Sequence, residues 1–303
     1  LGAMGAPMAG HLLDAGHEIA VWARRPEATT ALAARGAHVC ATPAALAARS
    51  EVVITIVTSS ADVEALAFGP EGLAQGFAPG AVHVDMSTIA PGMARELAAR
   101  YAERGIGWLD APVSGGEQAA RAAALAIMAG GEAAVLERVR PLLEILGKRI
   151  VHVGEAGAGQ VAKACNQMIM VNAIQACAEA MHLARAHGVD LAAVRHALMG
   201  GSAASKVLEL MGERMVAREF GAGIEARLHH KDFGLLLADA CRLGVPLPVA
   251  AQTGQQLNAL MAAGWGRDDT SSLLRVLEAA SAAPDGGRRP ESGSGDRELD
   301  GKC

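Results

Sequence analysis

Short, near-continuously apolar runs alternate with segments of helical character through the first half of the chain. The runs are rich in residues that favour strands, and the alternation predicts βαβ units. Strands that are apolar on both faces are typical of a mostly parallel sheet covered by helices on each side. We expect strands at Glu18–Trp22, Glu51–Val57, Ala81–Met86, Gly107–Asp110, Leu125–Met128 and Arg149–Val153.

The pattern changes after about Gly154. A helical stretch without an internal breaker runs from Gly159 to about His187, and it would measure about 40 Å at 1.5 Å per residue. Such a helix is long enough to connect two domains. Further helices are expected at Leu191–Met199, Ser202–Arg218, Lys231–Leu243, Pro246–Ala262 and Thr270–Ala280, with Asp190 and Asp269 as N-caps and Gly200 as a stop.

The chain of 303 residues exceeds the usual size of one domain. We therefore expect an α/β fold in which a Rossmann-type domain over 1–155 is followed by an all-helical domain over 156–280. The segment 281–303 is rich in Gly, Pro, Ser and mixed charge, so it is expected to be disordered.

Composition and charge narrow the function classes. The formal net charge of −5 has interspersed signs and offers no basic stripe for a nucleic acid. No apolar run approaches the ~20 residues that span a bilayer, and no signal segment is visible. The cysteines are odd in number and widely spaced, without metal-ligand spacing, which favours a reduced cytoplasmic setting and no metal site; they are Cys40, Cys165, Cys177, Cys241 and Cys303.

The chain starts on a glycine turn. In Leu1–Gly16, the residues Gly2, Ala3, Met4 and Gly5 match the end of a GxGxxG turn, in which glycines let the backbone approach a pyrophosphate. The strand and first glycine of that turn would precede Leu1, so we expect an N-terminally truncated Rossmann domain. Two glycines before a helix are also compatible with an ordinary loop and cap.

The second strand ends in an arginine pair instead of an acidic residue. A Rossmann fold places its ribose contact about 20 residues after the glycine turn, where this chain has Arg24 and Arg25. Guanidinium groups suit a 2′-phosphate, which favours NADP, with NAD as the other option. The alternative is a solvated arginine pair.

Two segments carry candidate chemistry. Asp110–Gly116 follows a strand and ends in Ser114, Gly115 and Gly116, whose hydroxyl and backbone N–H groups suit a carboxylate. In the second segment Lys163, Asn166 and Gln167 share one face near the start of the long helix. The helix dipole and burial would lower the pKa of Lys163 into a range useful for proton transfer. A lone surface lysine is the alternative.

A third segment, His230-Lys231-Asp232, is predicted to open a helix of the second domain. There Lys231 would meet a cofactor, and Asp232 would meet the substrate or a neighbouring helix. An ordinary charged first turn is equally compatible with the sequence. No histidine is assigned to catalysis.

Together these segments resemble the β-hydroxyacid dehydrogenase family, related to 3-hydroxyisobutyrate dehydrogenase, from Leu1 to about Ala280. Lys163–Gln167, Gly200–Leu208 and His230–Asp232 are most similar to its reductases of tartronate semialdehyde. The 3-hydroxyisobutyrate dehydrogenases, with a second Asn where this chain has Gln167, are close runners-up.

The resemblance implies hydride transfer between NAD(P) and a small carboxylate substrate, with Lys163 as proton donor and acceptor. It implies substrate contacts at Ser114, Gly115, Gly116, Asn166 and Gln167, to which the interpretation of the third segment adds Asp232. It also implies cofactor contacts at Val57, Thr58, Asp62, Thr88 and Lys231, with Thr58 in place of the commoner proline. A homo-oligomer, dimer or tetramer, is expected.

Two other functions fit parts of the pattern. Imine reductases share the two-domain plan but usually lack a lysine where this chain has Lys163, which favours alcohol and aldehyde chemistry. A noncatalytic dinucleotide-binding module is the alternative from a different class, since a fold alone does not prove activity.

Overall fold

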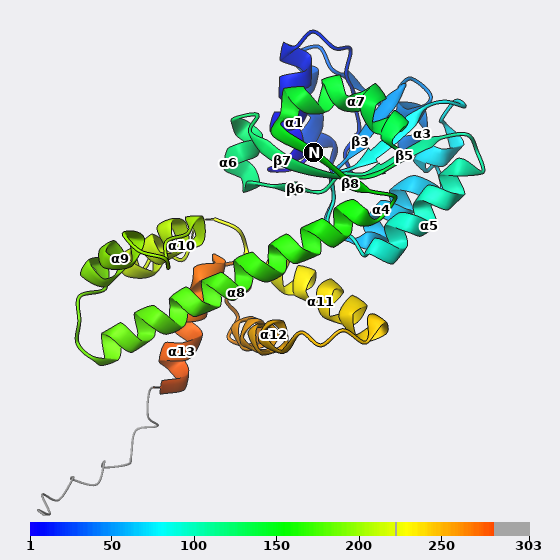
Figure 1. Cartoon of the computed structure of the whole chain (residues 1–303). Helices are drawn as coiled ribbons and strands as arrows, with labels where there is room; N and C mark the ends of the chain where they lie inside the picture. Colours follow the sequence, from blue (N-terminus) through cyan, green and yellow to red (C-terminus); the bar gives the residue numbers. More distant parts are fainter. Residues whose placement is uncertain (222, 282–303) are drawn as a thin grey trace, which may run out of the picture.

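The computed structural model describes residues 1–221 and 223–281. The first half is a mostly parallel sheet flanked by helices, and the second half is helical around one long helix (Figure 1). This arrangement confirms the predicted α/β class with a helical C-terminal part. Of the segment expected to be disordered, Ser281 instead ends the last helix, and 282–303 lie outside the described residues.

The larger sheet has the order β3-β4-β5-β7-β6, with β8 also pairing with β7. β3, β4 and β5 are parallel, whereas β7 runs antiparallel to β5 and β6. β1 and β2 form a separate parallel pair. The strands β2 and β6 are additional to those predicted. The strands are β1 (Ala20–Val21), β2 (His38–Val39), β3 (Val52–Thr55), β4 (Val82–Asp85), β5 (Gly107–Asp110), β6 (Val113–Ser114), β7 (Leu125–Gly131) and β8 (Gly147–Gly154).

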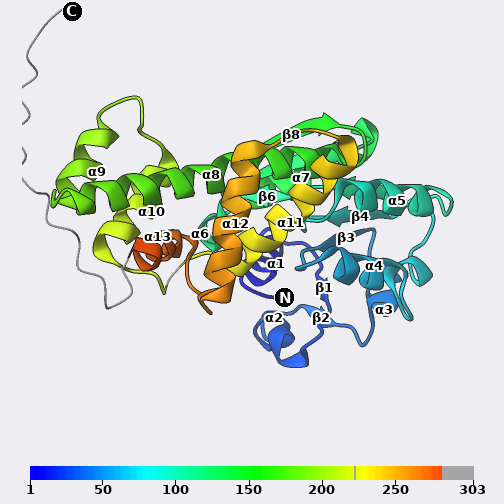
Figure 2. The same ribbon diagram turned by 90° about the horizontal axis from the view of Figure 1, so that it is seen from below.

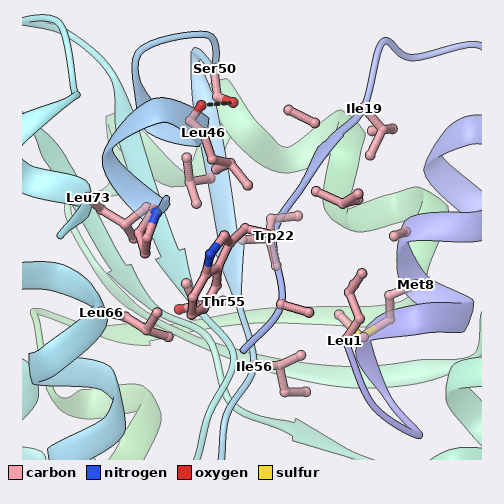
Figure 3. A pocket seen from close by; sticks show the side chains of 18 of the residues that line it. Leu1, Met8, Ile19, Trp22, Leu46, Ser50, Thr55, Ile56, Leu66 and Leu73 are labelled. Carbon is pink, nitrogen blue, oxygen red and sulfur yellow. Dashed lines mark hydrogen bonds between the residues drawn. The ribbon is translucent and has the colours of Figure 1, made fainter. Parts of the chain in front are cut away.

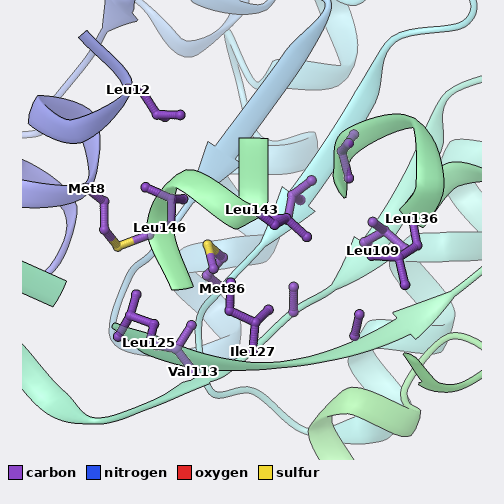
Figure 4. Packing of buried hydrophobic residues seen from close by; sticks show 14 of the residues in the cluster. Met8, Leu12, Met86, Leu109, Val113, Leu125, Ile127, Leu136, Leu143 and Leu146 are labelled. Atoms are coloured by element: carbon purple, nitrogen blue, oxygen red, sulfur yellow. The ribbon is translucent and has the colours of Figure 1, made fainter. Parts of the chain in front are cut away.

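Both faces of the sheet are covered by helices, as the apolar strands require. Leu109 of β5 packs with α1 (Gly5–Asp14) and α7 (Ala133–Leu146) in one core cluster (Figure 4). The preceding residue, Trp108, points the other way into a cluster with α4 (Ser60–Phe68) and α5 (Pro91–Ala102). Each fully buried large apolar side chain contributes about 1.5–3 kcal/mol.

The helical half is built around α8 (Ala158–Ala186), whose buried face carries Val171, Ile174 and Met181. No helix of the described residues is long and apolar enough to cross a membrane. The remaining helices are α2 (Thr30–Ala33), α3 (Pro43–Ala47), α6 (Gly116–Arg121), α9 (Leu191–Met199), α10 (Lys206–Ala217), α11 (Ala226–Leu243), α12 (Pro248–Ala262) and α13 (Leu273–Ser281), with short 3-10 helices at Pro26–Thr29, Leu73–Gln75 and Thr270–Ser272.

Two predicted helix starts are wrong. α10 begins at Lys206 because the Ser205 side chain accepts the N–H of Leu208 and caps the helix there. α11 begins at Ala226, whose N–H donates to Asp268 O, so its first turn is fixed by a distant loop. Lys231 and its neighbours therefore lie inside α11 and do not open it.

The pair β1–β2 lies beside α2, at the periphery of the sheet half (Figure 2). The carbonyl groups of Ile19 and Val21 accept the N–H groups of His38 and Cys40, so the backbone groups of Ala20 face away from β2. Thr55 O likewise bonds toward β4, and Ile54 faces away from it. Within the described part of the chain, two strand edges pair with no other strand: the edge of β1 that faces away from β2 and the edge of β3 that faces away from β4.

Candidate active site

The start of α8 is seated on the ends of β5 and β7 by Asp110. Its carboxylate accepts the N–H groups of Gly157 at 2.6 Å and of Gln160 at 2.9 Å, which would otherwise lack a partner at a helix start. A Cβ on Gly159 would lie 2.4 Å from Met128 O and 2.6 Å from Asp110 O. Only glycine allows this close approach, and the approach fixes where Lys163 emerges from the helix.

Lys163 is buried, with 8% of its surface exposed, and its Nζ donates to Val113 O at 2.7 Å. Burial lowers the pKa of Lys163 to about 8, because the charged ammonium loses its hydration. The nearby Lys231 lowers this pKa further, whereas Asp232 raises it. The pKa of Lys163 is thus lowered as expected, with burial as the largest cause, and the group can exchange a proton near neutral pH.

The predicted carboxylate loop lies next to the lysine, since Val113 precedes Ser114. Gly115 and Gly116 adopt φ values of +125° and +64°, which L side chains rarely adopt. Gly115 is the N-cap of α6, and no side chain caps that helix. Its first N–H groups therefore remain available for an anionic group.

Three of the predicted substrate residues form one hydrogen-bonded chain between α8 and α11. Asn166 Nδ2 donates to Gln167 Oε1 at 2.9 Å, and Gln167 Nε2 donates to Asp232 Oδ2 at 2.6 Å. The other oxygen, Asp232 Oδ1, is buried without a well-aligned hydrogen bond, but Lys231 Nζ lies 2.9 Å from it as an ion-pair partner. These three polar side chains are thus held in place by their neighbours.

Lys231 also reaches across from α11 to the sheet. Its Nζ donates to Thr58 O at 2.9 Å and to Thr88 O at 2.8 Å, in the loops after β3 and β4. The N–H of Val57 donates to Ser87 Oγ at 2.8 Å and ties the same two loops together. These loops lie at the carboxyl ends of parallel strands, where doubly wound sheets bind their ligands.

Four of the remaining predicted cofactor residues line a cavity of about 1650 Å³ between β1 and β3 (Figure 3); they are Gly2, Gly5, Arg24 and Asp62. Gly2 and Gly5 border it, whereas Met4, in the same turn as Ala3, packs against the core cluster of the sheet. No side chain caps α1, and a Cβ on Gly2 would meet nothing within 4 Å. In the first turn of α1, Ala6 N–H donates to Gly2 O and Pro7 has no N–H, so the fit to dinucleotide phosphates rests on the open space beside Gly2 and on the positive end of the helix.

Arg24 lies at the same cavity with 87% of its side chain exposed, and its guanidinium is 3.8 Å from Asp62 Oδ1. Asp62 itself accepts a hydrogen bond from Ser59, the N-cap of α4. An exposed ion pair of this kind contributes about 0–1 kcal/mol. Little free energy is therefore lost if the Arg24 side chain leaves Asp62 to bind a phosphate.

Sequence reasoning gave no role to four buried site residues: Asp85, Ser87, Asp110 and Gln160. Burial raises the pKa of Asp85 to about 6 and that of Asp110 to about 7. Asp110 was visible only as the residue before the carboxylate loop. Gln160 bonds to residues more than seventy positions away, so no local spacing signals its role.

Comparison with known proteins agrees with this geometry. Residues 1–154 match the family model of the NAD-binding domain of 6-phosphogluconate dehydrogenase. Residues 157–277 match the NAD-binding model of NADP-dependent 3-hydroxyisobutyrate dehydrogenase. A Rossmann-type sheet joined to a helical half, with a buried lysine between them, defines an NAD(P)-dependent dehydrogenase.

The chain belongs to the β-hydroxyacid dehydrogenases related to 3-hydroxyisobutyrate dehydrogenase, as the resemblance implied. It is 42% identical to the 2-hydroxy-3-oxopropionate reductase of Escherichia coli (92% of this chain, 95% of the relative). It is 38% identical to a 3-hydroxyisobutyrate dehydrogenase of Pseudomonas aeruginosa (83% and 87%). A Mycobacterium tuberculosis 3-hydroxyisobutyrate dehydrogenase structure, 33% identical, superimposes with a TM-score of 0.85 (91% and 96%).

Proposed function

We propose that this enzyme reduces tartronate semialdehyde to glycerate with NADPH, and catalyses the reverse oxidation. The observation that carries the proposal is the placement of Lys163. Its buried ammonium lies beside the Ser114–Gly116 loop, and Gln167, about one helical turn further along α8, donates a hydrogen bond to Asp232 of α11. The relative that is 42% identical bears the name of this reductase, which supports the substrate class.

In this mechanism the chain orients the substrate and moves one proton. Bound NADPH would supply a hydride to the aldehyde carbon. The Ser114 hydroxyl and the N–H groups of Gly115 and Gly116 would hold the substrate carboxylate. Lys163 Nζ donates its proton to the carbonyl oxygen as that oxygen becomes an alkoxide, and in the oxidation the neutral amine takes the proton back.

We propose that the polar pair Gln167–Asp232 selects a hydroxylated substrate over a methylated one. Tartronate semialdehyde carries a hydroxyl where methylmalonate semialdehyde carries a methyl group. The pair is buried and joined by a 2.6 Å hydrogen bond. A site that hydrogen-bonds a substrate hydroxyl discriminates strongly against an analogue without it, because its buried polar groups would be left unpaired.

The test is the rate of NADPH and NADH oxidation with tartronate, methylmalonate and succinic semialdehydes. We expect kcat/KM for tartronate semialdehyde to exceed the others by about tenfold or more. A preference for methylmalonate semialdehyde would make the enzyme a 3-hydroxyisobutyrate dehydrogenase. Binding of NADPH without turnover of any member of the panel would favour a noncatalytic dinucleotide-binding module.

The proposal extends to the domain plan and assembly. We propose a dinucleotide-binding domain over 1–155 and a helical substrate domain over 156–280. We also propose that a cytoplasmic homo-oligomer of two or four copies forms through the helical domain. Large apolar side chains there are exposed, among them Ile169 at 68% and Leu183 at 62%. Light scattering coupled to size-exclusion chromatography measures the assembly directly.

A further inference from the structure

Gln160 lies in the first turn of α8, one turn before Lys163, with 1% of its surface exposed. Its side chain makes two hydrogen bonds to the loop that follows β4. Oε1 accepts the N–H of Ile89 at 3.0 Å, and Nε2 donates to Ser87 O at 2.8 Å. The amide thus pairs with the backbone on both sides of Thr88, in the manner of a neighbouring strand.

The loop that Gln160 holds is tied to other parts of the site. Ser87 Oγ accepts the N–H of Val57 at 2.8 Å and donates to Asp85 at 2.7 Å. Lys231 Nζ donates to Thr88 O at 2.8 Å. We propose that the loops after β3 and β4 both contact the dinucleotide. These two loops are joined at Ser87 and Thr88.

The backbone N–H of Gln160 points to the end of β5, which precedes the loop that we propose to bind the substrate carboxylate. Its N–H donates to Asp110 Oδ2 at 2.9 Å, and Asp110 precedes the Ser114–Gly116 loop. One residue consequently connects three elements: the loop after β4, the end of β5 and the helix that carries Lys163. Hydride transfer depends on the distance between cofactor and substrate, and misplacement by about 1 Å can cost about a hundredfold in rate.

We propose that Gln160 is a positioning residue, which sets the dinucleotide-contacting loop at a fixed distance from Lys163. This inference rests on the proposed dehydrogenase function. It goes beyond that function because it assigns the alignment of the two halves to a residue that contacts neither the reacting carbon nor its oxygen.

The first test replaces the amide by an apolar side chain of similar length, Gln160→Met. The variant leaves Ile89 N–H and Ser87 C=O without their partner, and the loop is expected to shift. We expect NADPH affinity, measured by fluorescence titration, to fall about tenfold, and kcat to fall at least as much. KM for the semialdehyde is expected to stay within about twofold, because the Ser114–Gly116 loop keeps its own contacts.

Gln160→Glu tests the direction of each hydrogen bond. An ionised carboxylate accepts from Ile89 N–H but cannot donate to Ser87 O, whereas the protonated acid does both. We expect the ratio of variant to wild-type NADPH affinity to recover as pH falls from 9 to 5.5. A flat ratio would overturn the proposal.

The matched control is Gln175→Met, which removes another buried glutamine from the same helix. Gln175 is 6% exposed and bonds to Glu179 at 2.8 Å, away from the site. We expect its NADPH affinity and kcat to match wild type. Equal losses in both variants, or wild-type behaviour of Gln160→Met, would refute the proposal. The binding measurement needs no substrate, so failure of the proposed substrate is distinguishable from failure of this inference.

Discussion

The two halves of the candidate site differ in how firmly their side chains are held. Around Lys163 the side chains are buried and bonded to one another, with Lys163 8% and Gln160 1% exposed. Around the glycine turn they are open, with 87% of the Arg24 side chain and 39% of the Asp62 side chain exposed. Proton transfer requires groups fixed before the substrate arrives, whereas phosphate recognition relies on backbone N–H groups and flexible cations.

The largest expected effect tests the buried half. Lys163→Ala removes the proton donor, and we expect kcat to fall about 10³-fold. NADPH affinity is expected to stay within about twofold, because the glycine turn and Arg24 are untouched. Steady-state kinetics and fluorescence titration measure the two quantities.

A matched control for Lys163→Ala is Lys206→Ala. Lys206 is an exposed lysine that pairs with Glu209 at the start of α10. This variant is expected to behave as wild type. Turnover of Lys163→Ala within tenfold of wild type would show that another group donates the proton.

The second prediction concerns pH. Burial lowers the pKa of Lys163 to about 8, so the ammonium dominates below that pH and the amine above it. Reduction needs the ammonium, and its kcat/KM is expected to fall about tenfold per pH unit above pH about 8. Oxidation needs the amine, and its kcat/KM should fall by the same factor below that pH. Profiles without these opposite slopes would contradict the assignment of Lys163.

The third prediction concerns the open half. The lining of the cavity between β1 and β3 includes apolar side chains, among them Leu12, Leu46, Leu73 and Leu146. An engineered extension of about five apolar residues ahead of Leu1 is expected to pair with both free edges. We expect about tenfold tighter NADPH binding and a rise in Tm of about 5–10 °C.

The control for this extension carries proline at two of its five positions, since proline cannot donate to a strand ladder. It is expected to leave NADPH affinity and Tm unchanged. If both extensions act alike, strand pairing is not the cause. The measurements are differential scanning fluorimetry and NADPH titration.

The smallest effect is expected at Arg24. Arg24→Ala should lower the preference for NADPH over NADH about fivefold, because one exposed charge contributes only about 1 kcal/mol. Arg49→Ala is the matched control, since Arg49 lines the same cavity but follows α3, whereas Arg24 follows β1. An unchanged preference in Arg24→Ala would indicate that Arg24 is only a solvated side chain.

Local patterns predicted the long elements well. β5 and α9 have the predicted bounds, and α8 starts and ends within one residue of its prediction. β2 and β6, with two residues each, carry too little periodicity to detect. The start of α11 was missed because it depends on a bond from Ala226 to Asp268, which only the folded chain brings together.

In the candidate site, too, residues in local sequence motifs were predicted, and residues that act through distant contacts were not. Lys163 and the Ser114–Gly116 loop were visible because each forms a compact segment with a distinctive residue order. Asp110 and Gln160 were missed as site residues, since their carboxylate and amide act through contacts 47 to 73 positions away. Hydrogen bonds between a side chain and a distant backbone group produce no characteristic residue spacing in the sequence.

The two N–H groups that donate to Asp110 also bear on hydrogen exchange at the start of α8. The first N–H groups of a helix usually exchange quickly with solvent, because they lack partners within the helix. A buried N–H group that is hydrogen-bonded exchanges only when the surrounding structure opens. The amides of Gly157 and Gln160 are therefore expected to exchange slowly with deuterium, at rates close to those of the buried middle of α8.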